Sequence, residues 1–220
     1  MTVKPGKQIW QAIAEDIKEN IISGRYKPLD RLKEADLATK YSVSKTPIRE
    51  ALRHLEGVGF VEVVPHTMVT VKKVDAKEAM NLFSIQGVLE GLAARQAVSN
   101  LNEDHLRSLK RYADLIDRYR NADNTPEYEK ANFNFHYTLW KASKNENLFA
   151  LLLSIHEQIQ RYRAITRRYR SQFKNIIPGH TEILEALTRR DEEKSEQLVR
   201  SHIEWYGTAI VSLMKNESSG

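Results

Sequence analysis

The spacing of apolar residues changes from three or four to two and back again along this chain, and this double change constrains its fold most. Alternation is confined to FVEVV (60–64) and MVTVKK (68–73), which are separated by only three residues. A period of two is typical of strands, so the pair predicts a β-hairpin. No convincing strand pattern follows. The chain is therefore predicted to be mainly α, with a first domain, residues 1–73, and an all-helical second domain, residues 74–220.

Three short helices are predicted before the hairpin. Residues 7–22 carry one apolar stripe at helical spacing, formed by Ile9, Trp10, Ile13, Ile17 and Ile21. Gly24 follows and ends the helix. The segment KEADLATKY (33–41) predicts the second helix. Ser44 is the expected N-cap of the third helix, and Pro47 falls in its first turn, where the missing N–H does no harm.

The third predicted helix has two distinct faces. The face expected in the core carries Ile48, Ala51, Leu52 and Leu55. The opposite face carries cations and a hydroxyl, at Lys45, Thr46, Arg49 and Arg53. Three helices followed by a two-stranded hairpin form the layout of a winged helix-turn-helix, whose third helix enters the major groove of DNA. Ordinary solvation of a polar helix face is the alternative explanation for these charges.

The start of the third helix carries side chains suited to DNA. Lys45, Thr46 and Arg49 can reach base edges and phosphates, and an arginine can make a bidentate contact to guanine. Ser44 lies where the positive end of the helix dipole attracts a phosphate. His66, in the link of the hairpin, is the side chain best placed to touch the DNA backbone or minor groove from the wing.

The composition limits the cellular compartment and the partners expected for this protein. The chain has no cysteine, which excludes disulfides and thiolate metal sites and suits a reducing compartment. Its first residues lack the apolar core of a signal peptide, and no run approaches the ~18 apolar residues of a membrane span. We therefore expect a cytoplasmic protein without a membrane partner. The net charge of +5 favours nucleic acid or another anionic partner.

The first domain resembles a known family. The segment LKEADLATKYSVSKTPIREALRHLEGVGFVEVVP (32–65) resembles the DNA-binding domain of the GntR family of bacterial regulators. The resemblance implies that Lys45, Thr46 and Arg49 read a double-stranded operator and that the wing contributes through His66. Lys45 stands where the family usually has Arg, and the wing reads PHTM instead of PxRG. The residues expected to contact DNA are Glu34, Ser44, Lys45, Thr46, Arg49, Arg53 and His66.

Helices are predicted throughout the second domain. Thr125-Pro126, Pro178-Gly179 and Asp191 mark boundaries between them. The expected helical ranges are 75–98, 103–120, 126–143, 147–173, 177–189 and 192–214. Among their polar residues, Asn132 and His136 are one helical turn apart and project from one face. His180 and His202 fall in the last two helices, and by spacing alone each histidine could have a separate structural role.

Residues 75–214 resemble the FCD domain, the ligand-sensing helical bundle of the FadR branch of the GntR family. Many FCD domains hold a divalent metal with an Asp and three His, so the resemblance implies metal ligation by Asn132, His136, His180 and His202. Zinc or nickel is expected because imidazole suits both. Asn132 replaces the usual Asp with a weaker, neutral donor. Either a three-histidine site with water and a weak amide contact, or an empty pocket whose histidines bind a ligand, is compatible with this change.

The expected effector is a small anion such as a carboxylate, because a metal ion that keeps its full positive charge attracts anions. Gln86 occupies a position where the family commonly has Arg, so the pocket is expected to differ from that of the commonest relatives. Arg163 and Arg167 are weak candidates for facing the effector. Solvated or dimer-contact roles are the alternative for these arginines.

These features together predict a ligand-responsive transcription regulator, not an enzyme. It would bind a palindromic operator as a homodimer. Repression is expected because it is the commoner mode of action in the family. A metal-independent regulator that binds an organic or fatty acid is the alternative. A histidine-ligated metal hydrolase is a further alternative, which is disfavoured because no carboxylate is convincingly placed as its general base.

Overall fold

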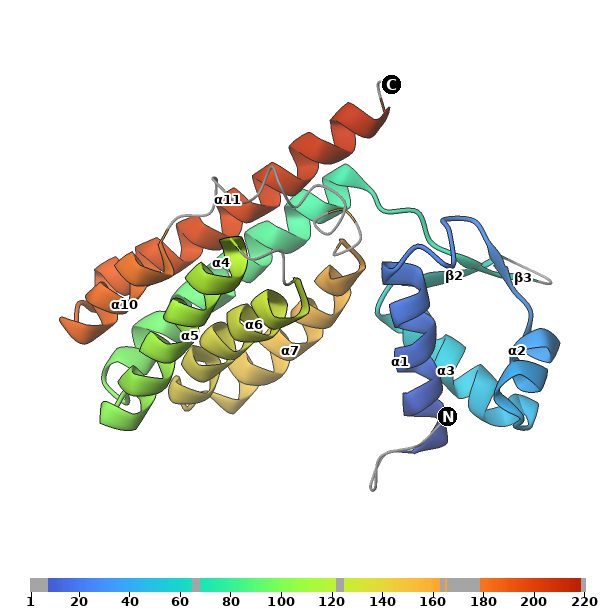
Figure 1. The fold of residues 1–220 in the computed structure, drawn as a ribbon, viewed down its shortest axis with the longest axis horizontal. Helices are drawn as coiled ribbons and strands as arrows, with labels where there is room; N and C mark the ends of the chain where they lie inside the picture. The colour runs from blue at the N-terminus through green and yellow to red at the C-terminus, as the bar shows by residue number, and fades with distance from the viewer. Residues whose placement is uncertain (1–7, 65–67, 122–124, 163–164, 166–178, 219–220) are drawn as a thin grey trace. The chain divides into compact units, whose positions relative to one another are not determined.

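The computed structural model describes residues 8–64, 68–121, 125–162, 165 and 179–218. The chain divides into two compact units (Figure 1). The first unit comprises Met1–Asp75 together with Glu157–Ala164, and the second comprises Ala76–His156 together with Ile165–Gly220. Each unit is described below by itself.

The first unit is built from three helices and a small antiparallel sheet. The helices are α1 (Ile9–Ile22), α2 (Glu34–Tyr41) and α3 (Lys45–Gly57). The strands are β1 (Arg31–Leu32), β2 (Val61–Val64) and β3 (Met68–Val71), in the order β1-β3-β2. The predicted hairpin is confirmed as β2 and β3, in register at Val63 and Val69. The sequence did not predict β1, because two residues have no detectable period.

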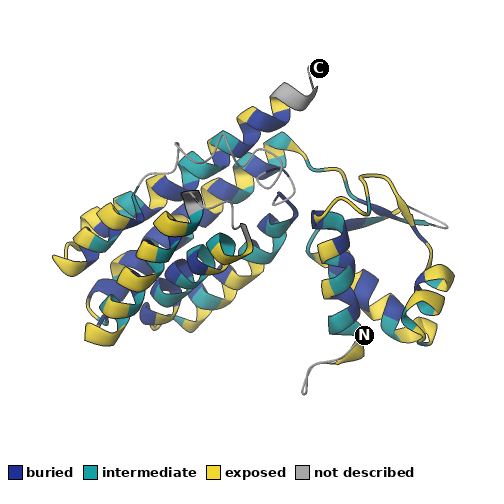
Figure 2. Ribbon diagram, viewed as in Figure 1, coloured by how far each residue is buried: buried dark blue, intermediate teal, exposed yellow. Residues whose placement is uncertain are grey.

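A single core joins the elements of the first unit. Its buried members, dark blue in Figure 2, include Ile13 and Ile17 of α1, Leu37 of α2, Ile48, Leu52 and Leu55 of α3, and Phe60, Val61 and Val71. The apolar face predicted for the third helix is thus confirmed. Ile9, expected on the stripe of the first helix, is instead 51% exposed, because it is the first residue of α1.

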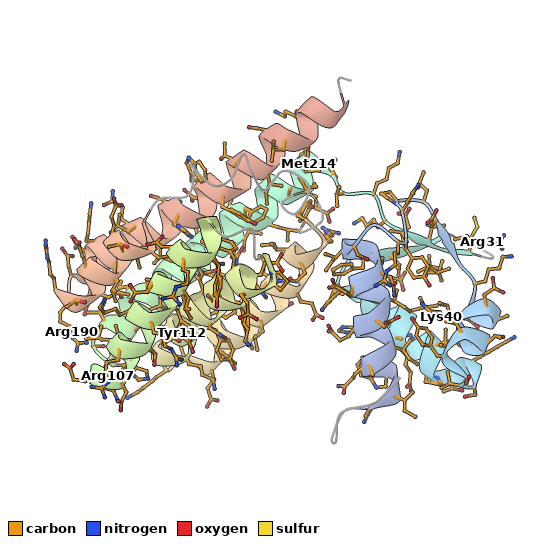
Figure 3. All side chains as sticks on the ribbon, in the orientation of Figure 1. Arg31, Lys40, Arg107, Tyr112, Arg190 and Met214 are labelled. Atoms are coloured by element: carbon orange, nitrogen blue, oxygen red, sulfur yellow. The ribbon has the colours of Figure 1, made fainter. Side chains whose placement is uncertain are left out.

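Asp16 ties α2 to α1. Its carboxylate accepts hydrogen bonds from the Tyr41 hydroxyl at 2.7 Å and from Asn20 Nδ2 at 2.8 Å. Nζ of Lys40, a residue labelled in Figure 3, lies 3.5 Å from the same carboxylate. Partial burial raises the pKa of Asp16, but the Tyr41 hydrogen bond and Lys40 outweigh it and hold that pKa below its ordinary value. This anchor holds the end of α2, directly before the turn that leads into α3.

The second unit consists of packed helices. They are α4 (Ala76–Val98), α5 (Glu103–Asn121), α6 (Thr125–Ala142), α7 (Glu146–Ile159) as far as His156, α10 (His180–Thr188) and α11 (Glu192–Ser218). The long helices α4 and α11 lie side by side, and α6 packs against both α4 and α5 (Figure 1). Buried residues such as Leu109, Phe135 and Leu187 form the core between them. Within the ranges that the structure describes, no helix is both long and apolar enough to cross a membrane.

The predicted helix 147–173 is interrupted at residues 160–162, so the expectation of one continuous helix was wrong, and its residues 163–164 and 166–173 lie outside the described ones. Helix α7 ends at Ile159 and a 3₁₀ turn, η1 (Gln160–Tyr162), follows. Arg161 is buried and donates from Nη1 to the carbonyl of Gly59 at 2.8 Å, and the Tyr162 hydroxyl donates to the carbonyl of Asp75 at 3.3 Å. These bonds hold the turn within the first unit. They join residues about a hundred positions apart, so local periodicity could not indicate them.

Glycines allow α4 and α11 to approach closely. A Cβ added at Gly91 would lie 3.0 Å from the carbonyl oxygen of Glu196, and one added at Gly207 would lie 2.4 Å from Cβ of Phe83. Phe83 is fully buried and cannot move aside without disturbing the core. The close packing of α4 against α11 therefore requires small residues at these positions.

We expect the substitution Gly207→Ala to lower the free energy of unfolding by ~1–3 kcal/mol, because the new methyl group overpacks the contact with Phe83. Thermal and urea melts of the full chain measure this loss. The matched control is Gly57→Ala, where nothing lies within 4 Å of the added Cβ. Equal stability of the two variants would contradict the close approach of α4 and α11.

Candidate functional site

A row of exposed polar side chains follows one side of α3. We call it the reading edge, and it consists of Ser44, Lys45, Thr46, Arg49 and Arg53, all of which are exposed. The core residues Ile48 and Leu52 point away from it, because a helical period separates the two faces. The structure thus places five of the seven predicted DNA contacts on one surface.

Ser44 occupies the N-cap position of α3 as predicted, with an extended backbone at φ −67° and ψ 169°, but its side chain does not form the cap hydrogen bond. The predicted N-cap position is thus confirmed, without the side-chain hydrogen bond that often accompanies it. The first-turn N–H groups of a helix have no partners within the helix itself. At the end of the reading edge they form, with the Ser44 hydroxyl, a group of donors suited to a phosphate.

Arg49 is held by an ion pair on the reading edge. Its Nε lies 2.9 Å from Oε2 of Glu34, which is the first residue of α2. The Arg49 side chain is nevertheless 65% exposed. Since a guanidinium has five N–H donors, one contact at Nε leaves the outer nitrogens available for an external acceptor. Glu34 therefore restricts the orientation of Arg49, and its own contact with DNA stays a prediction.

The second unit holds a buried cluster of three histidines, which we call the histidine centre. His136 of α6, His180 of α10 and His202 of α11 are each at least 94% buried, and their ligand atoms all lie within 4.8 Å of one another. The ring centroids of His180 and His202 are 4.6 Å apart, and both lie 5.4 Å from that of His136. The structure thus brings together three residues that the sequence places in three separate helices.

The residues around the histidine centre come from the start of α10 and the middle of α6. His180 is the first residue of α10, after Gly179, whose φ is +51°, and its ring packs against Phe135 at 4.8 Å. Asn132 lies one turn before His136 on α6 and is half-buried. By the helical period it projects from the same side of α6 as His136.

The histidine centre fits a divalent metal. Zinc binds imidazole nitrogen at ~2.0–2.1 Å, and three protein ligands with a remaining open position are a common arrangement. Nε2 of His136 is buried and has no hydrogen-bond partner among the residues that the structure describes. A buried polar atom is usually satisfied, so this nitrogen is suited to a ligand.

A carboxylate that the sequence analysis did not select adjoins the histidine centre. Glu90 of α4 is 2% exposed, and its Oε2 lies 2.6 Å from Nδ1 of His136. Gln86, one turn earlier on α4, donates from Nε2 to Oε1 of Glu90 at 2.6 Å. Burial raises the pKa of Glu90, but its interaction with His136 outweighs burial and holds that pKa below its ordinary value.

Gln86 is buried beside Glu90 and donates a hydrogen bond to it, and its predicted contact with an effector stays a prediction. The i, i+4 spacing of Gln86 and Glu90 on a helix of mostly small and apolar residues was the available signal for this pair. The remaining predicted residues, His66 of the wing and the effector candidates Arg163 and Arg167, lie outside the described residues.

Two family models match the chain. The model of the FCD domain matches residues 81–204, and that of bacterial regulatory proteins of the gntR family matches residues 10–71. An uncharacterised HTH-type transcriptional regulator of Bacillus subtilis is 27% identical over 84% of both chains. The Nta operon transcriptional regulator of Aminobacter aminovorans is 26% identical over 88% of this chain and 90% of its own length. A probable D-xylose utilization operon transcriptional repressor of Paenarthrobacter nicotinovorans is 23% identical over 88% of this chain and 85% of its own.

Solved structures share the fold. The E. coli protein McbR/YncC aligns with a TM-score of 0.78 at 22% identity, over 95% of this chain and 99% of its own. A transcriptional regulator structure from Rhodococcus aligns with a TM-score of 0.69 at 20% identity, over 92% of this chain and 97% of its own. At these identities the likeness concerns the arrangement of helices and sheet.

Proposed function

Because the chain belongs to the GntR family of bacterial transcriptional regulators and carries an FCD domain, we propose that it binds a palindromic operator as a homodimer and responds to a small-molecule effector. Regulation of transcription is the activity of the family and of the relatives named above, which are not enzymes. The hydrolase alternative is thereby excluded. We further propose that the protein acts in the bacterial cytoplasm as a repressor.

The reading edge carries the DNA-binding part of the proposal. In a winged helix-turn-helix, the N-terminal residues of the recognition helix contact base edges. Lys45 and Thr46 lie in the first turn of α3, and Arg49 one turn later, so all three can enter one groove. Arg49 would contact guanine, Ser44 and the helix N-terminus a phosphate, and Arg53 the DNA backbone. His66 of the wing would add a backbone or minor-groove contact.

We propose that His136, His180 and His202 hold a divalent metal, zinc or nickel, with Asn132 as a weak amide donor. When bound, the metal supplies an open coordination position for the effector, a small carboxylate. The residues of this chain provide buried imidazoles and exclude bulk water from the centre. A metal-independent regulator with an organic or fatty acid in the same bundle remains the second candidate, and elemental analysis of protein purified without chelator distinguishes the two.

The proposal as a whole is tested on DNA from the protein's own upstream region. We expect the mass in solution to be that of two chains and two chains to bind each palindromic site, because two-fold symmetry in the protein matches two-fold symmetry in the operator. Light scattering and fluorescence anisotropy at a fixed, near-physiological salt concentration measure these quantities. The proposal would be wrong if the protein were strictly monomeric and bound no genomic fragment more tightly than random duplex.

A further inference from the structure

A chain of three side chains runs from α4 to the histidine centre. Gln86 contacts Oε1 of Glu90, and Oε2 of Glu90 contacts Nδ1 of His136. All three side chains are buried, at 5%, 2% and 4% exposure. Each oxygen of the carboxylate therefore has a fixed neighbour, and Glu90 cannot turn away from His136 without losing one of them.

The contact at Nδ1 determines which nitrogen of His136 is available to a ligand. A neutral imidazole carries its proton on one nitrogen and offers the lone pair of the other. A carboxylate beside Nδ1 favours the proton there, so the lone pair is on Nε2. Neither ring nitrogen of His136 has a hydrogen bond within the described part of the chain, but Nδ1 lies 2.6 Å from Oε2 of Glu90, so Nε2 is the nitrogen left without a polar neighbour from Glu90. Outer-shell carboxylates of this kind orient metal-ligating histidines in many proteins.

We propose that Glu90 is the positioning residue of the histidine centre: it holds His136 with Nε2 available for a divalent metal and places, directly behind this ligand, the carboxylate that Asn132 lacks. This inference rests on the metal site of the proposed function. Gln86 is the support of Glu90, because its amide donates a hydrogen bond without cancelling the charge of the carboxylate. Trp140 and Phe135, both buried on α6, keep this region free of solvent.

The central test compares zinc affinity in the full-length wild type and in Glu90→Gln. We expect a ~10–100-fold loss, the range found when outer-shell partners of metal ligands are removed. Competition with a chromophoric chelator measures the affinity. The visible spectrum of bound Co²⁺ should change as well, because a reoriented His136 alters the ligand field; a purely structural role of Glu90 would leave that spectrum unaltered. The matched control, Glu193→Gln, removes an exposed carboxylate from α11 and should behave as wild type.

Charge compensation is tested by adding Asn132→Asp to Glu90→Gln. The new carboxylate lies one turn before His136, and we expect it to restore much of the lost affinity for zinc. Absence of any recovery would overturn the part of the inference that concerns charge. Gln86→Met leaves Glu90 in place but removes its support, and a smaller loss, ~3–10-fold, is expected. If the Glu90→Gln variant does not fold without metal, the zinc affinity of Gln86→Met becomes the test. A zinc affinity of Gln86→Met equal to that of wild type would then overturn the inference.

The outcomes separate this inference from the proposed function. If wild type binds zinc, His202→Ala does not, and Glu90→Gln binds as wild type does, the metal site stands and the role of Glu90 is wrong. If wild type itself binds no zinc, nickel or cobalt, the proposed metal site is wrong and the role of Glu90 falls with it.

Discussion

Replacing His136 with alanine is expected to abolish tight binding of a divalent metal. His136 is one of three buried imidazoles whose ligand atoms lie within 4.8 Å of one another, and Asn132 adds only a neutral amide. Structural zinc sites bind with ~10–16 kcal/mol for about four ligands, so one ligand contributes on the order of 3–4 kcal/mol, or roughly 10²–10³-fold in affinity. With only two histidines left, the site would not retain metal during purification.

Metal content by elemental analysis and the shift in melting temperature on adding zinc measure this effect. A ligand at 100 times its Kd stabilises the folded state by ~2.7 kcal/mol, and this stabilisation should disappear in the variant. His105→Ala is the matched control, because His105 lies on α5, bonded to Asn102 and outside the histidine centre. An equal metal-induced shift in wild type and His136→Ala would show that the centre is not the metal site.

Replacing Arg49 with alanine is expected to lower the preference for the operator over random duplex by ~1–3 kcal/mol, or about 5–150-fold. The side chain of Arg49 is exposed, and the ion pair with Glu34 presents its outer nitrogens along the reading edge. The affinity for the operator should fall more than that for random DNA, because Arg49 is expected to contact a base, whereas random DNA is bound mainly through phosphates. Weak binding that falls with rising salt should therefore persist.

Fluorescence anisotropy with operator and random duplexes at the same salt concentration measures this change. Arg107→Ala is the control, because Arg107 is an exposed arginine of α5 paired with Asp104 in the second unit (Figure 3). If Arg49→Ala weakened binding to both duplexes alike, Arg49 would be a phosphate contact and its assignment to base reading would be wrong. The core of α3 should be unaffected, because the Arg49 side chain is 65% exposed and takes no part in the core that Ile48, Leu52 and Leu55 form.

Much of the fold could be predicted from local patterns. Ile48, Leu52 and Leu55 are buried in the structure because a helix period of 3.6 places them on one face wherever the helix packs. The alternation in the hairpin was informative for the same local reason. Features that depend on distant partners were missed or wrong, namely β1, which pairs Arg31 with Thr70, and the turn at Arg161, which bonds to Gly59.

In the candidate site, too, local features could be predicted from the sequence and contacts between distant residues could not. The residues of the reading edge lie within one short helix, so their common exposure followed from the sequence. Ser44 was expected to cap α3 by its residue type, but a cap requires a particular side-chain rotamer, which the sequence does not specify. His136, His180 and His202 were expected together only through the resemblance to the FCD domain, since nothing in their spacing brings three helices to one point.

The sequence by itself determined the order of helices and strands, their buried faces and the cationic edge of α3, because these properties depend on neighbours within a few residues. Only the tertiary structure decided that Glu90 lies against His136 and that Gln86 supports it. Contacts between helices depend on how side chains interlock across the whole core, and a buried glutamate is placed by all the partners that offset the cost of removing its charge from water.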